Sequence, residues 1–402
     1  MEIRPCRDED ELREALGGIG HYFGWVPDAE SAERFARNLP LDRMYAVRVD
    51  GTLAGGGGTF PFELTVPGGR VRAGGVTVVG ILPTHRRRGL LSGLMRAQLD
   101  AMRERGEHVA YLWASEDRIY GRFGYGMASQ TVWIDVSRDH AGFALPYEPA
   151  GTVRLVELDG ALATFPDVYE RVAVRTPGMF GRTPTWWQTR ALRDAPDRRN
   201  GGGPHVRVAY EEGGRVDGYA IYRVHAGWED GLPNGHVDVI EALGATPQAT
   251  AGIWRYLLDV DWMQFVRARL LPPDHELRFL VAEPRHLRAR VGDGLWVRLV
   301  DVGEALRART YAQREPVTIE LSDEYCPWNE GRWRVGPDGV DRSDGEPELR
   351  CDVRELGSAY LGGVAWNELV RAGRVEELAA GAAARATALF AADRAPWCPE
   401  IF

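Results

Sequence analysis

Three consecutive arginines and a glycine stand between an apolar, strand-like stretch and a helix-like stretch in "VTVVGILPTHRRRGLLSG", residues 76–93. A strand that turns into a helix here would present free backbone N–H groups and the positive end of the helix dipole to an anion. Arg87 and Arg88 would add charge, and Gly89 would let a phosphate approach the main chain. The segment therefore predicts a pyrophosphate-binding loop, and the alternative is a solvated basic turn at the start of a helix.

The chain ends in "PWCPEIF", residues 396–402, which is unusually apolar for an end of a chain. Untethered termini fray because they bury nothing, so Trp397, Ile401 and Phe402 predict a tail that docks. The α-carboxylate of Phe402 would go with it. Such a group has an ordinary pKa of about 3.5, so at neutral pH it is ionised and can accept a proton.

The elements that would position these residues form an α/β unit in the first ~145 residues. Two helix-like segments begin with aspartates suited to cap them, and a series of strands broken by "DG" and "PGG" turns follows. The apolar stripe Leu91, Leu94, Met95, Gln98 and Met102 predicts a helix after the arginines. The expected ranges are 8–23 and 28–39 for the first helices, 44–82 for the strands, 83–106 for the third helix and 108–115 for a further strand.

The middle of the chain repeats this pattern. Residues 206–224 match the early strand–turn–strand, and "VIEALGATPQATAGIWRYLLD", residues 239–259, matches the strand, loop and helix around the arginines. An internal repeat predicts two copies of one fold. In the second copy Ala249, Thr250 and Ala251 replace the arginines, so only one working anion site per chain is expected.

Residues from about 288 onward predict a third, α+β domain, with short strands and hairpins followed by helices and a last helical tract at 367–396. The net charge of −9 argues against a nucleic-acid partner. No apolar run approaches ~20 residues and the start is charged, so we expect no membrane partner and a cytoplasmic location. Single cysteines and histidines without HxxxH or HExxH spacing lead us to expect no metal site.

The arginine loop resembles the acetyl-CoA pyrophosphate loop of the GNAT superfamily, whose pattern is (Q/R)xxGx(G/A). Here the residues run from Arg86 to Leu91, and Leu91 departs from the small residue of the pattern. The segment "ASEDRIYGRFGYG", residues 114–126, resembles the "Y…GF" element of the same superfamily. The resemblance implies that acetyl-CoA binds to a set of backbone and side-chain groups: Val79, Gly80, Ile81, Arg87, Arg88, Gly89, Leu90, Leu91, Ser92, Ser115 and Glu116.

The two motifs together, with "LGSAYLGG" at 356–363 and an aromatic C-terminus, resemble the Eis-type acetyltransferases. The resemblance implies two tandem GNAT-like domains, the second degenerate, followed by a sterol-carrier-protein-like α+β domain. We place these at 1–147, 148–287 and 288–402, with the tail docking into the active site. It also implies a homohexamer and acetylation of primary amines of polycationic small molecules (aminoglycoside-like), with lysine side chains as further acceptors.

Acetyl transfer from a thioester to an amine needs a base for the amine and an acid for the departing thiolate. Tyr120 is the predicted acid, because a phenol keeps its proton at neutral pH, and Tyr125 is its rival. The Phe402 α-carboxylate is the predicted base, with Glu116 as an alternative and a purely structural tail as another. Aromatic residues near the N-terminus, namely His21, Tyr22, Phe23, Trp25 and Phe35, are predicted walls of the substrate pocket or members of the core.

Two classes of function compete with an enzyme. A lipid or small-molecule carrier would rest on the third domain alone, which leaves the arginine loop and "IYGRFGYG" without a role. A regulatory binding protein built on two inactive copies predicts loss of the arginines from both, and only the second copy has lost them. The sequence therefore favours the enzyme.

Overall fold

The computed structural model describes residues 1–313 and 315–402, which divide into two compact units. The first unit contains residues 1–129, 294–396 and 401–402, and the second contains 130–293 and 397–400. The chain therefore passes from one unit to the other four times, and the two units are described separately below.

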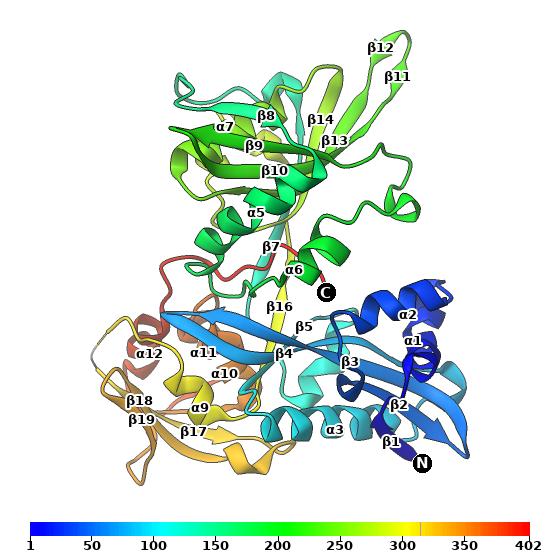
Figure 1. Ribbon diagram of the computed structural model, residues 1–402. Coiled ribbons are helices and arrows are strands. Elements are labelled where there is room, and N and C mark those ends of the chain that lie inside the picture. The colour runs from blue at the N-terminus through cyan, green and yellow to red at the C-terminus, as the bar shows by residue number, and fades with distance from the viewer. Residues whose placement is uncertain (314) are drawn as a thin grey trace. The chain divides into compact units, whose positions relative to one another are not determined.

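The first unit is built on a seven-stranded sheet in the order β1-β2-β3-β4-β5-β16-β6 (Figure 1). The expected strands and helices are confirmed, and Asp8 and Asp28 cap the first two helices. The elements in chain order are β1 (Glu2–Pro5), α1 (Glu9–Phe23), α2 (Ala29–Ala36), β2 (Met44–Val49), β3 (Thr52–Val66), β4 (Gly69–Ile81), α3 (Leu90–Glu104), β5 (Val109–Trp113), α4 (Asp117–Tyr120), β6 (Gly126–Met127) and β16 (Leu295–Leu299).

Helices α1 and α3 cover opposite faces of this sheet, and glycines in β3 let them approach. A Cβ on Gly56 would lie 2.8 Å from the carbonyl oxygen of Ala15 in α1, whereas one on the next residue, Gly57, would face Leu94 of α3. Successive strand residues point to opposite faces, which is why neighbouring glycines serve different helices. Close packing of α1 on β3 and β4 brings the end of α1 over the end of β4.

Two strands, β7 (Gln130–Ser137) and β16, belong to other sheets than the domain limits expected from the sequence would give them. β7 pairs with β14 (Met263–Leu271) and β15 (Arg290–Asp293) in the second sheet. β16, expected in the third domain, lies between β5 and β6 in the first sheet. Strand pairing of this kind links residues far apart in sequence, and local patterns do not reveal it.

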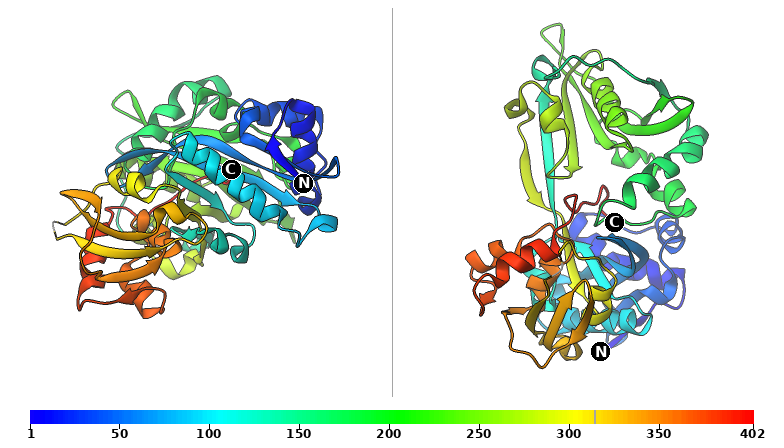
Figure 2. Two further views of the ribbon diagram at one scale, coloured as in Figure 1. Left: turned by 90° about the horizontal axis from the view of Figure 1, so that it is seen from below. Right: turned by 90° about the vertical axis from the view of Figure 1, so that its left-hand side faces the viewer.

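The second unit is also built on a seven-stranded sheet, in the order β15-β7-β14-β13-β10-β9-β8, and Figure 2 shows it from two further sides. The repeat predicted from residues 206–259 is present as two antiparallel strands, a third strand and a helix. The remaining elements are β8 (Thr152–Leu155), α5 (Leu158–Ala173), α6 (Pro184–Trp186), β9 (Val206–Glu212), β10 (Arg215–His225), β11 (Trp228–Glu229), β12 (Leu232–Pro233), β13 (Gly235–Gly244), α7 (Pro247–Leu258) and α8 (Leu277–Leu280).

A five-stranded sheet in the order β19-β18-β17-β20-β21 forms the C-terminal part of the first unit. The prediction of one helical tract over 367–396 is wrong in its middle. Gly373 and Gly381 adopt positive φ angles, and the stretch between these two glycines is not helical. The elements are α9 (Val302–Arg307), β17 (Val317–Ser322), β18 (Gly331–Gly336), β19 (Gly339–Arg342), β20 (Leu349–Asp352), α10 (Val353–Tyr360), α11 (Trp366–Arg371), β21 (Glu376–Glu377) and α12 (Ala382–Phe390).

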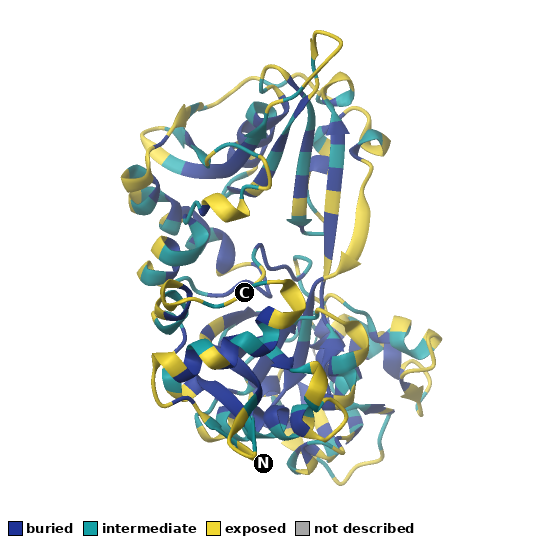
Figure 3. Ribbon diagram, turned by 90° about the vertical axis from the view of Figure 1, so that its right-hand side faces the viewer, coloured by how far each residue is buried: buried dark blue, intermediate teal, exposed yellow. Residues whose placement is uncertain are grey.

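Burial follows the strands in both units, as Figure 3 shows, with exposed residues concentrated on turns and on the outer sides of helices. Among the residues described, no helix combines the length and the apolar character needed to span a bilayer.

Candidate active site

Strand β4 carries a bulge next to the predicted cofactor residues. Its register against β3 slips between Gly56 and Gly58, and Val78 has a φ of +48°, which is rare for a β-branched residue. The pairing of β4 with β5 covers only residues 73–75 of β4. Beyond that point, among the described residues, the backbone of residues 76–81 faces no partner strand on the β5 side, so its groups are available to an extended ligand.

The arginine loop leaves the start of α3 open. Gly89 is the N-cap, with a φ of +77°, and no side chain among the described residues caps it. The first N–H groups of α3 are therefore free of a capping acceptor and face outward with the positive end of the helix dipole. An anion would bind here without displacing a protein group.

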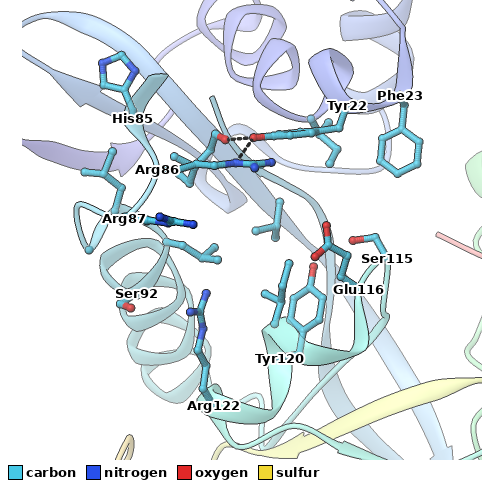
Figure 4. Close-up of a pocket in the computed structure, with 18 residues that line it drawn as sticks. Tyr22, Phe23, His85, Arg86, Arg87, Ser92, Ser115, Glu116, Tyr120 and Arg122 are labelled. Atoms are coloured by element: carbon cyan, nitrogen blue, oxygen red, sulfur yellow. Dashed lines mark hydrogen bonds between the residues drawn. The ribbon is translucent and has the colours of Figure 1, made fainter. Parts of the chain in front are cut away.

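A cavity of about 530 Å³ joins the open edge of β4 to this helix start (Figure 4). Nearly all predicted cofactor residues line it: Val79, Gly80, Ile81, Arg87, Gly89, Leu90, Leu91, Ser92, Ser115 and Glu116, together with the predicted acid Tyr120. Arg88 is exposed and is not among the lining residues. The structure therefore brings together residues from β4, α3 and the segment after β5, and separates Arg88 from them.

Three arginines project toward the same hollow in Figure 4, namely Arg86, Arg87 and Arg122. The backbone of Arg87 is in the left-handed region, with a φ of +61°. No motif in the sequence indicates a role for Arg122. It stands two residues after Tyr120 in the short helical turns that follow β5, and only the fold shows that this places it at the cavity.

Tyr120 ends α4 directly after β5, and its side chain is 6% exposed. In Figure 4 its hydroxyl end points toward Ser115 and Glu116. Burial raises the pKa of Tyr120, hydrogen bonding with the Ser115 side chain opposes this, and the Glu116 charge adds to it. The phenol therefore keeps its proton well beyond neutral pH and can donate it to a group that becomes basic.

Tyr125, the rival acid, lies behind Tyr120, with the ring centroids 6.0 Å apart. It is fully buried and does not line the cavity, and burial raises its pKa above the usual range. The nearby positive charge of Arg298 acts on the Tyr125 pKa in the opposite direction to burial, and a Cβ on Gly124 would collide with the Arg298 guanidinium. Tyr125 is thus placed to support the turn that carries Tyr120.

Tyr22, the penultimate residue of α1, makes a contact that the sequence did not indicate. Its hydroxyl donates to the Ile81 carbonyl oxygen at 2.5 Å and accepts from Arg86 Nε at 2.8 Å, both drawn in Figure 4. The Arg86 guanidinium also lies 4.8 Å from the centre of the Tyr22 ring. These residues are about sixty positions apart, so only the packing of α1 on β4 brings them together.

The Phe402 side chain is buried where β4 and β5 separate. Its ring centroid lies 5.2 Å from that of Phe62 and 5.0 Å from that of Tyr111, in edge-on contacts. A Cβ on Gly75 would approach the same ring to 3.2 Å. Gly75 and Tyr111 are the last residue pair that joins β4 to β5, so the end of the chain lies in the first unit at the opening of this fork.

The other anchors of the tail differ from the expectation in one respect. Trp397 is buried in the second unit, where its backbone N–H donates to the Pro177 carbonyl at 2.8 Å. Glu400 pairs with the buried Arg182 at 3.0 Å. Ile401, expected to anchor the tail, is 58% exposed and buries little, because its neighbours Glu400 and Phe402 make the inward contacts.

A row of aromatic rings leads to Phe402 from the N-terminal region. Trp25 lies 6.4 Å from Phe35, which stacks at 6.5 Å on Phe60, and Phe60 lies 5.3 Å from Phe62. Trp25 and Phe35 are therefore half-buried members of this row, whereas Tyr22 and Phe23 line the cavity. His21 is exposed, and its ring makes an edge contact with that of Tyr22.

The corresponding helix start in the second unit is closed. Thr246 caps α7, and its side chain accepts from the backbone N–H of Ala249 at 3.1 Å. Thr250 in turn donates to the Thr246 carbonyl. This N–H group is satisfied and the loop has no arginine, so the second copy has fewer groups that can bind an anion than the first copy has.

Comparisons with known proteins agree with this geometry. Residues 2–128 and 178–299 match acetyltransferase (GNAT) domain families, and residues 302–399 match a sterol carrier protein domain. An uncharacterised N-acetyltransferase of Streptomyces coelicolor is 41% identical over the whole of both chains. N-acetyltransferase Eis of Mycobacterium tuberculosis is 33% identical over 90% of each chain.

Among solved structures, Eis1 of Mycobacterium abscessus superposes with a TM-score of 0.87 and 34% identity over all of both chains. A GCN5-related N-acetyltransferase of Anabaena variabilis, with a TM-score of 0.84 and 20% identity over both full chains, shares the fold. The predicted fold class of two GNAT domains and a sterol-carrier-like domain is thereby confirmed. The chain belongs to the Eis-type N-acetyltransferases of the GNAT superfamily.

Proposed function

We propose that this N-acetyltransferase uses acetyl-CoA and that the cavity of the first unit binds it. When bound, acetyl-CoA supplies a thioester-linked acetyl group for transfer to an amine. The observation that carries the proposal is one continuous hollow that joins an unpaired strand edge, an uncapped helix start and inward-pointing arginines. The strand edge suits an amide-bearing arm, and the helix start with Arg87 and Arg122 suits a pyrophosphate.

The proposed acid is Tyr120. It lines the cavity just after β5, and its raised pKa keeps it protonated until a thiolate needs the proton. Ser115 and Glu116 lie at the hydroxyl end of this side chain and would orient it. Tyr125 does not line the cavity, which favours Tyr120 for this role.

The proposed base is the α-carboxylate of Phe402. This residue is not among those that line the cavity, but contacts with Tyr111 and Gly75 hold its ring at the fork between β4 and β5. An acceptor amine that enters along the aromatic row would lose its proton there and attack the acetyl carbon. Glu116, an exposed residue at the hydroxyl end of Tyr120, is the competing base. In this proposal the end of the tail supplies the carboxylate in place of a side chain.

The proposed acceptors are primary amines of polycationic small molecules, aminoglycosides among them, and lysine side chains. The net charge of −9 favours cationic substrates. A panel of such amines is incubated with acetyl-CoA while free thiol is measured. Release well above hydrolysis with at least one polyamine supports the proposal, and its absence across the panel contradicts it. The expected homohexamer is tested on the same preparation by mass photometry.

The role of the tail is tested by adding three glycines after Phe402. Every side chain of the tail is retained, but the carboxylate moves by up to ~10 Å. We expect kcat to fall by ~10²–10⁴-fold with acetyl-CoA affinity unchanged. The variant Ile401→Ala, which alters an exposed side chain and leaves the carboxylate in place, is the control and keeps its activity. An extended protein that turns over normally would show the tail to be structural.

A further inference from the structure

Two histidines lie opposite each other at one end of the β10–β13 ladder in the second sheet. His225 is the last residue of β10 and pairs with His236 of β13 in the antiparallel ladder. Asp238 follows two positions later on the same strand, and side chains two apart in a strand share a face. One ligand atom from each of the three residues lies within 4.8 Å of the other two.

The distances between these atoms are those of a coordination sphere. Asp238 Oδ2 lies 3.1 Å from His225 Nε2, and Asp238 Oδ1 lies 3.6 Å from His236 Nε2. Zinc binds such atoms at ~2.0–2.2 Å in tetrahedral geometry, which puts neighbouring ligand atoms about 3.4 Å apart. The imidazole rings are stacked, with centroids 4.3 Å apart and planes 10° apart, so both present the same edge to the carboxylate.

The positive charges next to Asp238 are neutralised by other carboxylates. The ladder places Asp238 opposite Arg223 on one side and Arg267 on the other. Arg223 pairs with Asp194 at 2.7 Å, and Arg267 pairs with Asp135 at 3.2 Å. Within residues 1–313 and 315–402, the ion-pair partners of Asp238 are the two histidines, so its carboxylate is available to a cation.

Both imidazoles can offer a lone pair. The Nε2 atom of His225 is buried and has no hydrogen-bond partner among the described residues. A metal ion would bind each imidazole through its unprotonated nitrogen. A Cβ on Gly202 would lie 2.6 Å from His225 Nε2, so the loop before β9 closes the far side of this nitrogen.

We propose that His225, His236 and Asp238 form a binding site for a divalent transition-metal ion, zinc in the first instance, with water in the remaining position. Two imidazole nitrogens and a carboxylate suit zinc, copper or nickel rather than magnesium or calcium. The ion connects β10 to β13 at the point where the chain leaves β10 to form the hairpin of β11 and β12 (Figure 1). Sequence spacing does not reveal the site, because the ladder brings together residues on two strands.

The test uses the full chain without an affinity tag, stripped with EDTA and dialysed, and titrated with zinc chloride against a chromophoric zinc indicator. We expect one tightly bound zinc ion per chain, no competition from magnesium, and a zinc-dependent rise in melting temperature. His236→Gln and Asp238→Asn should each weaken zinc binding by at least about tenfold and abolish the rise. Far-ultraviolet circular dichroism in EDTA confirms that these variants fold.

A second cluster supplies the matched control. His140, His286 and Glu283 also gather three candidate ligand atoms, but on two short helical turns with more exposed side chains. The double variant His140→Ala/His286→Ala should bind zinc as the unaltered chain does. Loss of binding in this control, binding that survives His236→Gln and Asp238→Asn, or no binding by the unaltered chain would each overturn the proposal.

Discussion

The three arginines of the loop should contribute unequally to acetyl-CoA binding, because only some of them face the cavity. Arg87 lines it, and Arg88 is exposed outside it. A charge-assisted contact with phosphate contributes ~1.5–3 kcal/mol, so Arg87→Ala should weaken binding by ~10–100-fold. An exposed charge at a distance contributes at most ~1 kcal/mol, so Arg88→Ala should weaken it by about fivefold or less.

Calorimetric titration with acetyl-CoA at low and high salt measures both effects. Alanine at position 87 keeps the cost of the positive φ angle that arginine already bears, so the comparison isolates the side chain. A truncated acetyl thioester without phosphates provides the control, and its turnover should be equal in the Arg87→Ala variant and the unaltered enzyme. Equal losses from Arg87→Ala and Arg88→Ala would refute the argument from the cavity.

Three further variants test the acid and its support. Tyr120→Phe should lower kcat by ~10²–10⁴-fold with acetyl-CoA affinity retained. Burial raises the pKa of Tyr120, so in the unaltered enzyme this phenol should keep its proton below pH 10 and lose it only above. A pH profile of kcat checks this. Asp323→Asn leaves Arg298 charged in a site where both side chains are at most 1% exposed, and should lower the free energy of unfolding in urea by ~3–5 kcal/mol. Arg298→Met/Asp323→Asn, which removes the buried charge and keeps an acceptor for the Cys326 N–H, should restore part of it, and an equally unstable double variant would contradict this account.

Much of the fold could be predicted from local patterns. Aspartate caps, "DG" turns and apolar stripes set the positions of α1, α2, α3 and the strands between them, since each depends on residues close in sequence. The placement of β7 and β16 could not be predicted, because strand partners are chosen by packing across the whole chain. Local patterns do not reveal the break between α11 and α12, because helical spacing continues on both sides of two left-handed glycines.

The residues of the site likewise divide into those that a sequence motif predicts and those that only the fold brings together. A loop motif shows which residues surround one helix start, and all but Arg88 of the predicted cofactor residues line the cavity. Contacts between distant segments carry no such signal. Arg122, the bond from Tyr22 to Ile81 and the metal-ligand cluster of the second sheet all depend on which elements the fold sets side by side.

The two helix starts of the repeat explain in physical terms why one site per chain is expected. At the first, Gly89 has no side chain to offer, so the N–H groups of α3 lack a capping acceptor and keep their affinity for an anion. At the second, the Thr246 hydroxyl accepts from Ala249, which stabilises α7 by about 1 kcal/mol relative to an alanine cap. The same N–H groups cannot be both capped from within and open to a phosphate. Helix stability and anion binding are therefore alternatives at this position, and each copy of the repeat has adopted one of them.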